Sequence, residues 1–225
     1  MTRRHEALVL VSYGSHGIVE LDDGRRLDCK YRRQVGRPFC GDRVSVAIHG
    51  DAGVVEAIRP RRNRFVRADR QQRQHVVAAN LDRVLIVLAL KPLPSRDLLD
   101  RYLLAVHSLG IEPVIVLNKV ELDAPPADSA GAAVISRLPQ YEALGYVVLK
   151  TSCKGDPGVA VLEPVLENRT SILVGQSGVG KSSLVRALLP DLDIQTGELS
   201  RVTGKGTHTT TTTILYALPG GGRLM

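Results

Sequence analysis

Short apolar runs separated by turn residues fill the first quarter of the chain. The runs cover Leu8–Val11, Gly17–Leu21, Arg43–Ile48 and Val54–Ile58. Between the second run and Arg26-Leu27-Asp28 stands Asp23-Gly24, a strong hairpin signal because type I′ turns need residues that tolerate positive φ. Four or five short strands at this spacing predict a small β-barrel. A β-sandwich fragment is the alternative, which the shortness of the segment disfavours.

From about residue 76 apolar runs alternate with amphipathic segments. Val84–Leu90 is continuously apolar, as expected for a strand buried on both faces. Ser95 is the expected N-cap of a helix that runs through Leu109 and ends at Gly110. Further strands are expected at 113–117, 146–149, 171–174 and 213–217, and further helices at 132–144, 158–167 and 181–189. This alternation predicts an α/β domain whose parallel sheet is covered on both faces.

Basic residues are concentrated in the first third of the chain. Residues 1–75 hold 16 Lys and Arg against 9 Asp and Glu, whereas residues 76–225 hold 14 of each, so the net charge of +7 lies in the first part. Seven of the fifteen residues from 59 to 73 are arginine. A positive electrostatic field confined to one part of the chain indicates a nucleic-acid partner, because basic side chains that neutralise phosphates release the counterions condensed on them. A solvated arginine-rich surface is the alternative. The predicted domains are an OB-like RNA-binding barrel (1–65), a basic linker (66–80) and the α/β domain (81–225).

Composition excludes several other classes. Aromatic residues make up 4 % and Trp is absent, which argues against a site that stacks bases on aromatic platforms. Cys29, Cys40 and Cys153 are an odd number without metal-ligand spacing, so we expect reduced thiols and no zinc site in this chain. The N-terminus does not read as a secretory signal, and no apolar run approaches membrane-spanning length. We expect a cytoplasmic monomer with no membrane partner.

Residues 175–182 match the phosphate-loop pattern. Their sequence is Gly175-Gln176-Ser177-Gly178-Val179-Gly180-Lys181-Ser182, followed by Ser183. A strand enters this segment and a helix leaves it, which is the context that the pattern requires. Glycines let backbone N–H groups approach phosphates, and the helix N-terminus adds partial positive charge. We expect Lys181 to reach the β- and γ-phosphates and the Ser182 hydroxyl to bind Mg²⁺.

Two further motifs indicate which base is bound. Asn118-Lys119-Val120-Glu121 follows the strand expected at 113–117, where a loop at a carboxyl end can reach a ligand. In a guanine site the Asn contacts N7, the Lys stem covers the ring and an acid accepts from N1 and the exocyclic amine. That acid is usually Asp, and Glu121 is one methylene longer. Thr151-Ser152-Cys153-Lys154 would bring a backbone N–H to guanine O6. These motifs predict GTP and GDP as ligands, and Asn118 with Lys119 argues against an ATP site.

The order of the motifs is unusual, because in an ordinary GTPase both base motifs follow the phosphate loop. A circular permutation of the same sheet and site explains the order found here. With the basic barrel and the segments 78–82 and 204–210, the chain resembles the ribosome small subunit-dependent GTPase A family (RsgA, also called YjeQ) over essentially its whole length. The resemblance implies a bacterial cytoplasmic GTP hydrolase that helps the small ribosomal subunit mature, with that subunit and its rRNA as partners.

The segment from Gly204 to Thr213 is rich in Thr and lies where a first switch is expected. By the resemblance, Thr209 joins Ser182 as a Mg²⁺ ligand when γ-phosphate is present, and His208 orients the attacking water as the catalytic residue. For His208, a solvent-exposed loop residue is the alternative. The Asp-x-x-Gly motif that should follow the strand at 213–217 is absent, and Asp128-Ser129-Ala130-Gly131, which matches its letters, stands before the phosphate loop.

The resemblance also implies a further domain with a Cys/His zinc site, which these residues do not contain. We therefore expect a GTPase domain that is incomplete at its C-terminus. The first hypothesis is a ribosome-activated GTP hydrolase, whose activity in this chain alone is open. The alternative is an RNA-bound guanine-nucleotide-binding module without turnover, because the second switch is missing.

Overall fold

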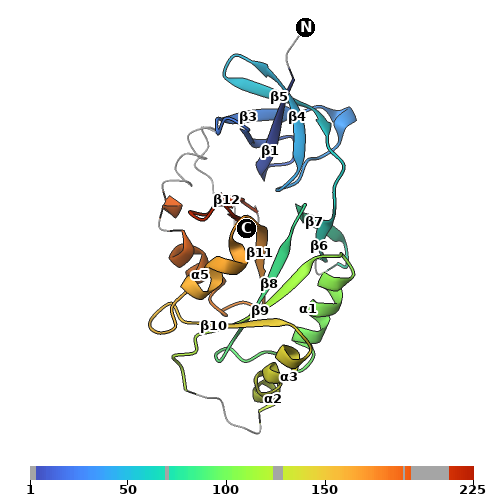
Figure 1. Ribbon diagram of the computed structural model, residues 1–225. Coiled ribbons are helices and arrows are strands. Elements are labelled where there is room, and N and C mark those ends of the chain that lie inside the picture. Colours follow the sequence, from blue (N-terminus) through green and yellow to red (C-terminus); the bar gives the residue numbers. More distant parts are fainter. Residues whose placement is uncertain (1–3, 69–70, 124–128, 190, 194–212) are drawn as a thin grey trace. The chain divides into compact units, whose positions relative to one another are not determined.

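The chain folds into two compact units. The computed structural model describes residues 4–68, 71–123, 129–189, 191–193 and 213–225 (Figure 1). The barrel unit comprises residues up to Leu81, Asp191–Tyr216 and Met225. The sheet unit comprises Asp82–Pro190 and Ala217–Leu224.

Five strands close the barrel in the order β1-β2-β3-β5-β4 (Figure 1). They are β1 (Arg4–Ser12), β2 (His16–Leu21), β3 (Arg26–Tyr31), β4 (Arg43–His49) and β5 (Ala52–Ile58), with a 3₁₀ turn at Arg33–Val35. Neighbouring strands are antiparallel except β3 and β5, which pair in parallel. This closed barrel confirms the OB-like prediction, because five strands in a partly Greek-key order define that fold.

Alternate residues of the barrel strands point inward and form its core. A strand's side chains alternate between two faces, so each strand gives the core every second residue. The buried members are Ala7, Val9, Val19, Leu21, Leu27, Cys29, Val44, Val46 and Val55. A second cluster joins Leu10, Val11, Ile18, Cys40 and Leu215. Leu215 reaches it because its backbone N–H donates to the carbonyl of Leu10 at 2.9 Å and Ile214 bridges to Val11.

The basic segment after the barrel is largely an antiparallel hairpin. Strands β6 (Arg64–Ala68) and β7 (Gln74–Ala79) pair with each other in a separate two-stranded sheet. The hairpin is joined to the barrel by backbone and side-chain bonds: the N–H of Ala79 donates to the carbonyl of Cys40 at 2.9 Å, and the Asn80 amide donates to Gly41 at 2.9 Å. The segment predicted as a linker (66–80) therefore contains most of β6 and all of β7, within the barrel unit.

The sheet unit is built on parallel strands, as predicted. The strand order is β10-β9-β8-β11-β13-β12 (Figure 1). The bounds are β8 (Arg83–Ala89), β9 (Glu112–Asn118), β10 (Val147–Thr151), β11 (Thr170–Val174), β12 (Tyr216–Ala217) and β13 (Arg223–Leu224). Register pairing is parallel between β10 and β9, β9 and β8, β8 and β11, and β11 and β13. The carboxyl ends of these strands consequently lie at one edge of the sheet.

Helices connect the strands, with bounds that differ somewhat from the prediction. They are α1 (Leu98–His107), α2 (Ala130–Ser136), α3 (Leu138–Ala143), a 3₁₀ turn at Ala160–Leu162, α4 (Glu163–Leu166) and α5 (Lys181–Leu188). Helix α1 takes Asp97 rather than Ser95 as its N-cap. The single helix expected at 132–144 is two helices that meet at Arg137, because Pro139 lies in the first turn of α3 and cannot continue an earlier helix.

Candidate nucleotide site

The loop between β11 and α5 has a backbone that only glycine accommodates at two points. Gly175 has φ of +146° and Gly180 has φ of +96°. A Cβ on Gly175 would stand 2.3 Å from the carbonyl oxygen of Val87, and one on Gly180 would stand 2.4 Å from the Asn118 side-chain nitrogen. The loop thus lies tightly between neighbouring strands, and Val179 anchors it with a side chain that is buried in the core of the sheet unit.

Lys181 lies across this loop. Its Nζ donates to the carbonyl oxygens of Gly175 at 2.8 Å and Gln176 at 2.9 Å. The Gln176 amide donates in turn to the carbonyl of Leu93 at 3.0 Å. Ser177, Ser182 and Ser183 are exposed. Helix α5 therefore begins with a fixed cation and exposed hydroxyls at its N-terminus, where the helix dipole favours negative charge.

Asn118, at the end of β9, is joined directly to the phosphate loop. Its Nδ2 donates to the carbonyl of Val179 at 2.9 Å, and its Oδ1 accepts from the Thr151 hydroxyl at 3.0 Å. The side chain is buried. Each amide has two N–H donors and two lone pairs, so one donor and one lone pair remain for a ligand. The motif that precedes the loop by nearly sixty residues is thus adjacent to it in space.

Lys119 adds a second connection to the loop. Its Nζ donates to the carbonyl oxygens of Gly178 at 2.6 Å and Lys91 at 2.8 Å. Its backbone is left-handed, with φ of +63°, which turns the chain sharply after β9. The N–H of Val120 then donates to the carbonyl of Thr151 at 3.3 Å. The lysine stem is consequently stretched along the edge of the site.

Glu121 and the loop after β10 lie together. A hydrogen bond from the Ser152 hydroxyl is the main cause that holds the pKa of Glu121 below its ordinary value, and Lys154 and Lys119 lower it further. The Ser152 oxygen accepts from the backbone N–H groups of Lys154 and Gly155, both at 3.0 Å. Glu121 is therefore an anion held beside a tight turn. Cys153 in that turn is exposed as a residue, but partial desolvation of its thiol and the nearby charge of Glu121 raise its pKa, so the thiol is protonated at neutral pH.

Two contributions to this site were not predicted. Thr151 is buried and orients the Asn118 amide, and the segment from Lys91 to Leu93 supplies carbonyl oxygens to Lys119 and Gln176. Both lie at carboxyl ends of strands, β10 and β8, and that position is the signal that could have identified them. His208 and Thr209, expected to be catalytic and Mg²⁺-binding, lie outside the described residues. Among the residues that the structure describes, no group of three or more His, Cys, Asp or Glu side chains could hold a metal ion.

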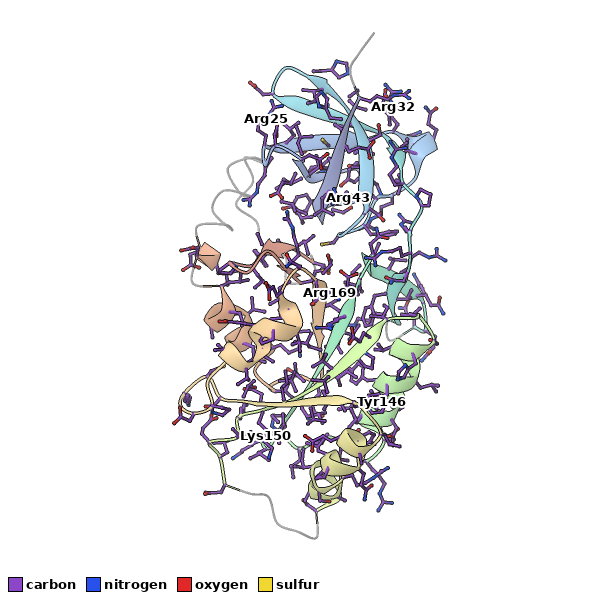
Figure 2. The ribbon with its side chains drawn as sticks, in the orientation of Figure 1. Arg25, Arg32, Arg43, Tyr146, Lys150 and Arg169 are labelled. Carbon is purple, nitrogen blue, oxygen red and sulfur yellow. The ribbon has the colours of Figure 1, made fainter. Side chains whose placement is uncertain are left out.

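Arginines cover the barrel unit, but several are already paired. Arg25, Arg32 and Arg43 lie at the barrel surface (Figure 2), with carboxylate partners Asp23, Glu56 and Asp22. Arg33, Arg64 and Arg67 form no ion pair among the described residues. A pocket of about 420 Å³ is lined by Val35, Ile58, Arg59, Arg61 and Arg64. No described helix is long and apolar enough to span a membrane.

A family model and the curated relatives both assign this chain to the same family. A family model described as RsgA GTPase matches residues 58–225. The small ribosomal subunit biogenesis GTPase RsgA 1 of Vibrio vulnificus is 42 % identical over 97 % of this chain and 63 % of its own length. RsgA of Shewanella oneidensis is 38 % identical over 96 % of this chain and 62 % of its own length. The chain thus spans less than two thirds of these curated relatives.

Solved structures share the fold. The crystal structure of YjeQ from Thermotoga maritima superposes with a TM-score of 0.72 and 28 % identity, over 99 % of this chain and 73 % of that one. YloQ, described as a circularly permuted GTPase, superposes with a TM-score of 0.68 and 23 % identity over 99 % and 70 %. These matches confirm the predicted architecture, in which a barrel accompanies a permuted GTPase sheet.

Proposed function

The chain belongs to the RsgA GTPase family, and from this premise we propose that it binds GTP and GDP and that the whole protein hydrolyses GTP during maturation of the small ribosomal subunit. The observation that carries the nucleotide assignment is the bond from the Asn118 amide to the carbonyl of Val179 at 2.9 Å. It joins the base-reading segment to the phosphate loop, so one nucleotide can contact both.

In the proposed complex the phosphates lie over the backbone N–H groups of residues 175–182. Lys181, whose Nζ already lies on the loop, is the cation that contacts them. The guanine base lies along the Lys119 stem, with Asn118 facing N7 and the ionised Glu121 accepting from N1 and the exocyclic amine. Ser152, Cys153 and Lys154 form the turn whose backbone faces O6. Val120 separates Lys119 from Glu121 in this motif.

Mg²⁺ fits the same end of α5. The Ser182 hydroxyl is exposed in the first helical turn, and hydroxyl and phosphate oxygens are the ligands that this hard cation prefers. When bound, the metal neutralises charge that develops on the phosphates. We propose Thr209 as its second protein ligand and His208 as the residue that orients water, both from the family resemblance.

The small ribosomal subunit is the proposed partner, reached through rRNA. The curated relatives carry small ribosomal subunit biogenesis in their names. Three arginines of the barrel unit form no ion pair with any described residue, and they support a phosphate-binding surface there: Arg33, Arg64 and Arg67. We further propose that the protein acts as a monomer in the cytoplasm.

A displacement assay tests the nucleotide proposal. The chain is loaded with fluorescent GDP in the presence of Mg²⁺, and unlabelled GDP, GTP or ATP is added. Because ATP would leave the charged Glu121 without its donors, GDP and GTP should displace the probe at concentrations about tenfold to a hundredfold lower than ATP. Equal displacement by ATP would refute the guanine assignment. Phosphate release with and without purified small subunits then measures turnover, with Lys181→Ala as the inactive control.

A further inference from the structure

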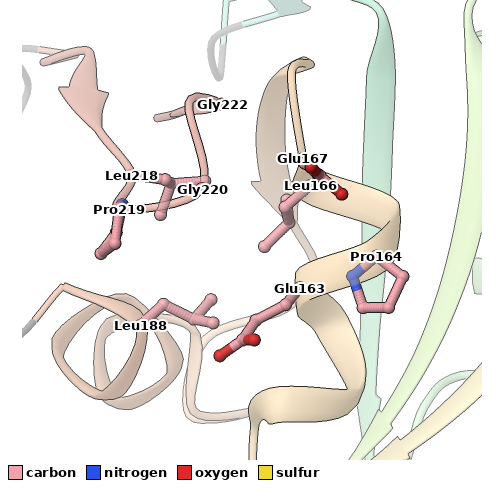
Figure 3. Close-up of a pocket in the computed structure, with 9 residues that line it drawn as sticks. All are labelled: Glu163, Pro164, Leu166, Glu167, Leu188, Leu218, Pro219, Gly220 and Gly222. Carbon is pink, nitrogen blue, oxygen red and sulfur yellow. The ribbon is translucent and has the colours of Figure 1, made fainter.

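A pocket of about 340 Å³ in the sheet unit lies outside the proposed nucleotide site (Figure 3). Three elements frame it: helix α4, the C-terminal end of α5 and the turn that joins β12 to β13. The lining residues are Glu163, Pro164, Leu166, Glu167, Leu188, Leu218, Pro219, Gly220 and Gly222. Its floor is thus formed by leucine and proline side chains, and two carboxylates stand at its border.

The two carboxylates have no cationic partner within the part of the chain that the structure describes. Glu163 and Glu167 are exposed, and neither forms an ion pair among the residues that the structure describes. Figure 3 shows Glu163 extending from the start of α4 toward Leu188, with Leu166 directed into the space before the turn. Two like charges beside an apolar floor favour a ligand that brings positive charge and an apolar group together. They disfavour nucleic acid, whose phosphates would be repelled.

We propose that this pocket docks a basic segment of a protein partner, in which a Lys or Arg side chain stands next to an apolar one. The apolar group contacts Leu166, Leu188 and Leu218, and the cation pairs with Glu163 and Glu167. A long basic side chain suits this geometry, because its methylene stem packs on apolar surface while its charged end reaches the carboxylates. The proposal does not depend on nucleotide binding.

The turn between β12 and β13 offers a way to close the pocket without disturbing the fold. Gly222 cannot carry a side chain, since its Cβ would lie 2.0 Å from the Leu166 carbonyl oxygen. Gly220 can: its Cβ would meet nothing nearer than the Glu167 Cγ at 3.9 Å, and its φ lies outside the left-handed region. Gly220→Phe should therefore place a ring in the pocket.

The test uses the ¹⁵N-labelled chain and two synthetic probes, acetyl-Leu-Arg-Leu-Lys-amide and its acidic counterpart acetyl-Leu-Glu-Leu-Glu-amide. The basic peptide should shift the amide signals of Leu218, Gly220 and Gly222 in a saturable way, and the acidic peptide should not. Gly220→Phe should abolish the shifts. Glu163→Gln with Glu167→Gln should weaken binding about tenfold, since each exposed pair contributes a factor of about 2 to 5.

Glu142→Gln serves as the matched control, because Glu142 is an exposed glutamate on α3 away from the pocket. It should leave the affinity unchanged. Equal binding of both peptides, or an unaltered affinity in Gly220→Phe, would overturn the proposal. So would argininamide alone binding as tightly as the peptide, since the pocket would then be a site for small cations.

Discussion

The Asn118 amide lies 2.9 Å from the carbonyl oxygen of Val179 and 3.0 Å from the Thr151 hydroxyl, so that it joins three loops of the sheet unit at once. An amide in this position is both a structural bridge and a proposed ligand contact. Removing it leaves two buried polar groups without partners, which costs about 1–3 kcal/mol for each.

Asn118→Ala should therefore lower both stability and guanine affinity. We expect the free energy of unfolding to fall by about 2–6 kcal/mol, the sum for the two groups, and GDP affinity to fall at least about tenfold. Chemical denaturation and GDP calorimetry measure the two effects. Thr151→Val is the control, because it removes the hydroxyl that orients the amide and leaves the amide itself. A variant Asn118→Ala that bound GDP normally would disprove the base-reading role.

Lys181→Ala should separate binding from folding. The lysine donates to the carbonyls of Gly175 and Gln176, two half-buried residues of its own loop, so water can replace it there. We expect thermal unfolding close to that of the unaltered chain, and loss of tight GDP binding in calorimetry. Lys150→Ala is the matched control, since Lys150 is an exposed lysine on β10 (Figure 2). Unchanged affinity in Lys181→Ala would mean that residues 175–182 form only a structural turn.

Glu121 should set the preference for guanine. Glu121→Asp should retain or tighten GDP binding, and Glu121→Ala should weaken it by about tenfold to a hundredfold, because a charge-assisted hydrogen bond is worth about 1.5–3 kcal/mol. Inosine diphosphate, which lacks the exocyclic amine, is the comparison ligand, and Glu121→Ala should weaken its binding less than that of GDP. A larger effect of Glu121→Ala on ATP than on GDP would contradict this assignment.

The lowered pKa of Glu121 fixes the sign of the pH dependence. A carboxylate whose pKa lies below the ordinary 4.5 stays charged on moderate acidification. Guanine preference should thus be constant from neutral pH to about pH 5 and decline only as the pH falls through the lowered value. Displacement curves at several pH values measure it. A decline that began above about pH 6 would indicate that another group controls binding.

Local sequence patterns predicted the strands of the sheet unit well, but they did not predict the contacts between its loops. The apolar run at 84–90 corresponds to β8 with a shift of one residue. The agreement is close because a strand buried on both faces is apolar over nearly its whole length. The contact of Asn118 with Val179 joins residues that are 61 positions apart, so it depends on strand order. The motifs indicated that these residues lie at the same edge of the sheet, but the distances between their atoms came only from the structure.

The arginine-rich region shows where composition was insufficient. Charge predicted a linker over 66–80, whereas β6 and β7 pair as an antiparallel hairpin. Composition also treated the arginines as equal. Arg61 instead makes a bidentate pair with Asp42, with both oxygens at 2.7 Å, and lies 4.9 Å from the centre of the Phe39 ring. Composition alone cannot distinguish an arginine that pairs with a buried carboxylate from one that pairs with an exposed carboxylate.

Replacing Arg61 should consequently lower the free energy of unfolding more than replacing Arg59. Asp42 is fully buried, so Arg61→Gln leaves a buried charge without its cation, and we expect a loss of about 2–4 kcal/mol, discounted because Arg61 is partly exposed. Arg59 pairs with the half-exposed Glu6, so Arg59→Gln should have a clearly smaller effect on the free energy of unfolding. Urea denaturation of the two variants checks the difference. Equal losses would show that burial of Asp42 is not decisive.

The same distinction governs the test of RNA binding. Arg33, Arg64 and Arg67 have no ion-pair partner among the described residues, so replacing them removes charge without breaking an ion pair in that part of the fold. Arg61 is unsuitable, because its replacement would disturb the barrel. The triple variant Arg33→Gln, Arg64→Gln, Arg67→Gln should bind small ribosomal subunits more weakly. The slope of log affinity against log salt should fall by about two to three units, at about 0.7–0.9 for each phosphate that is no longer neutralised.

A triple variant of equal charge in the sheet unit provides the control for this measurement. Arg96, Arg101 and Arg186 are exposed there, and changing all three to Gln lowers the net charge by the same amount. If phosphate contacts are local to the barrel unit, this control should keep nearly the full salt slope, whereas a general effect of net charge would flatten both slopes equally. GDP affinity should be unchanged in the barrel variant, because the proposed nucleotide site belongs to the sheet unit. Identical slopes for the unaltered chain and the barrel variant would mean that these arginines are a solvated surface, and rRNA binding would then have to rest on other basic residues such as Arg25, Lys30 and Arg32.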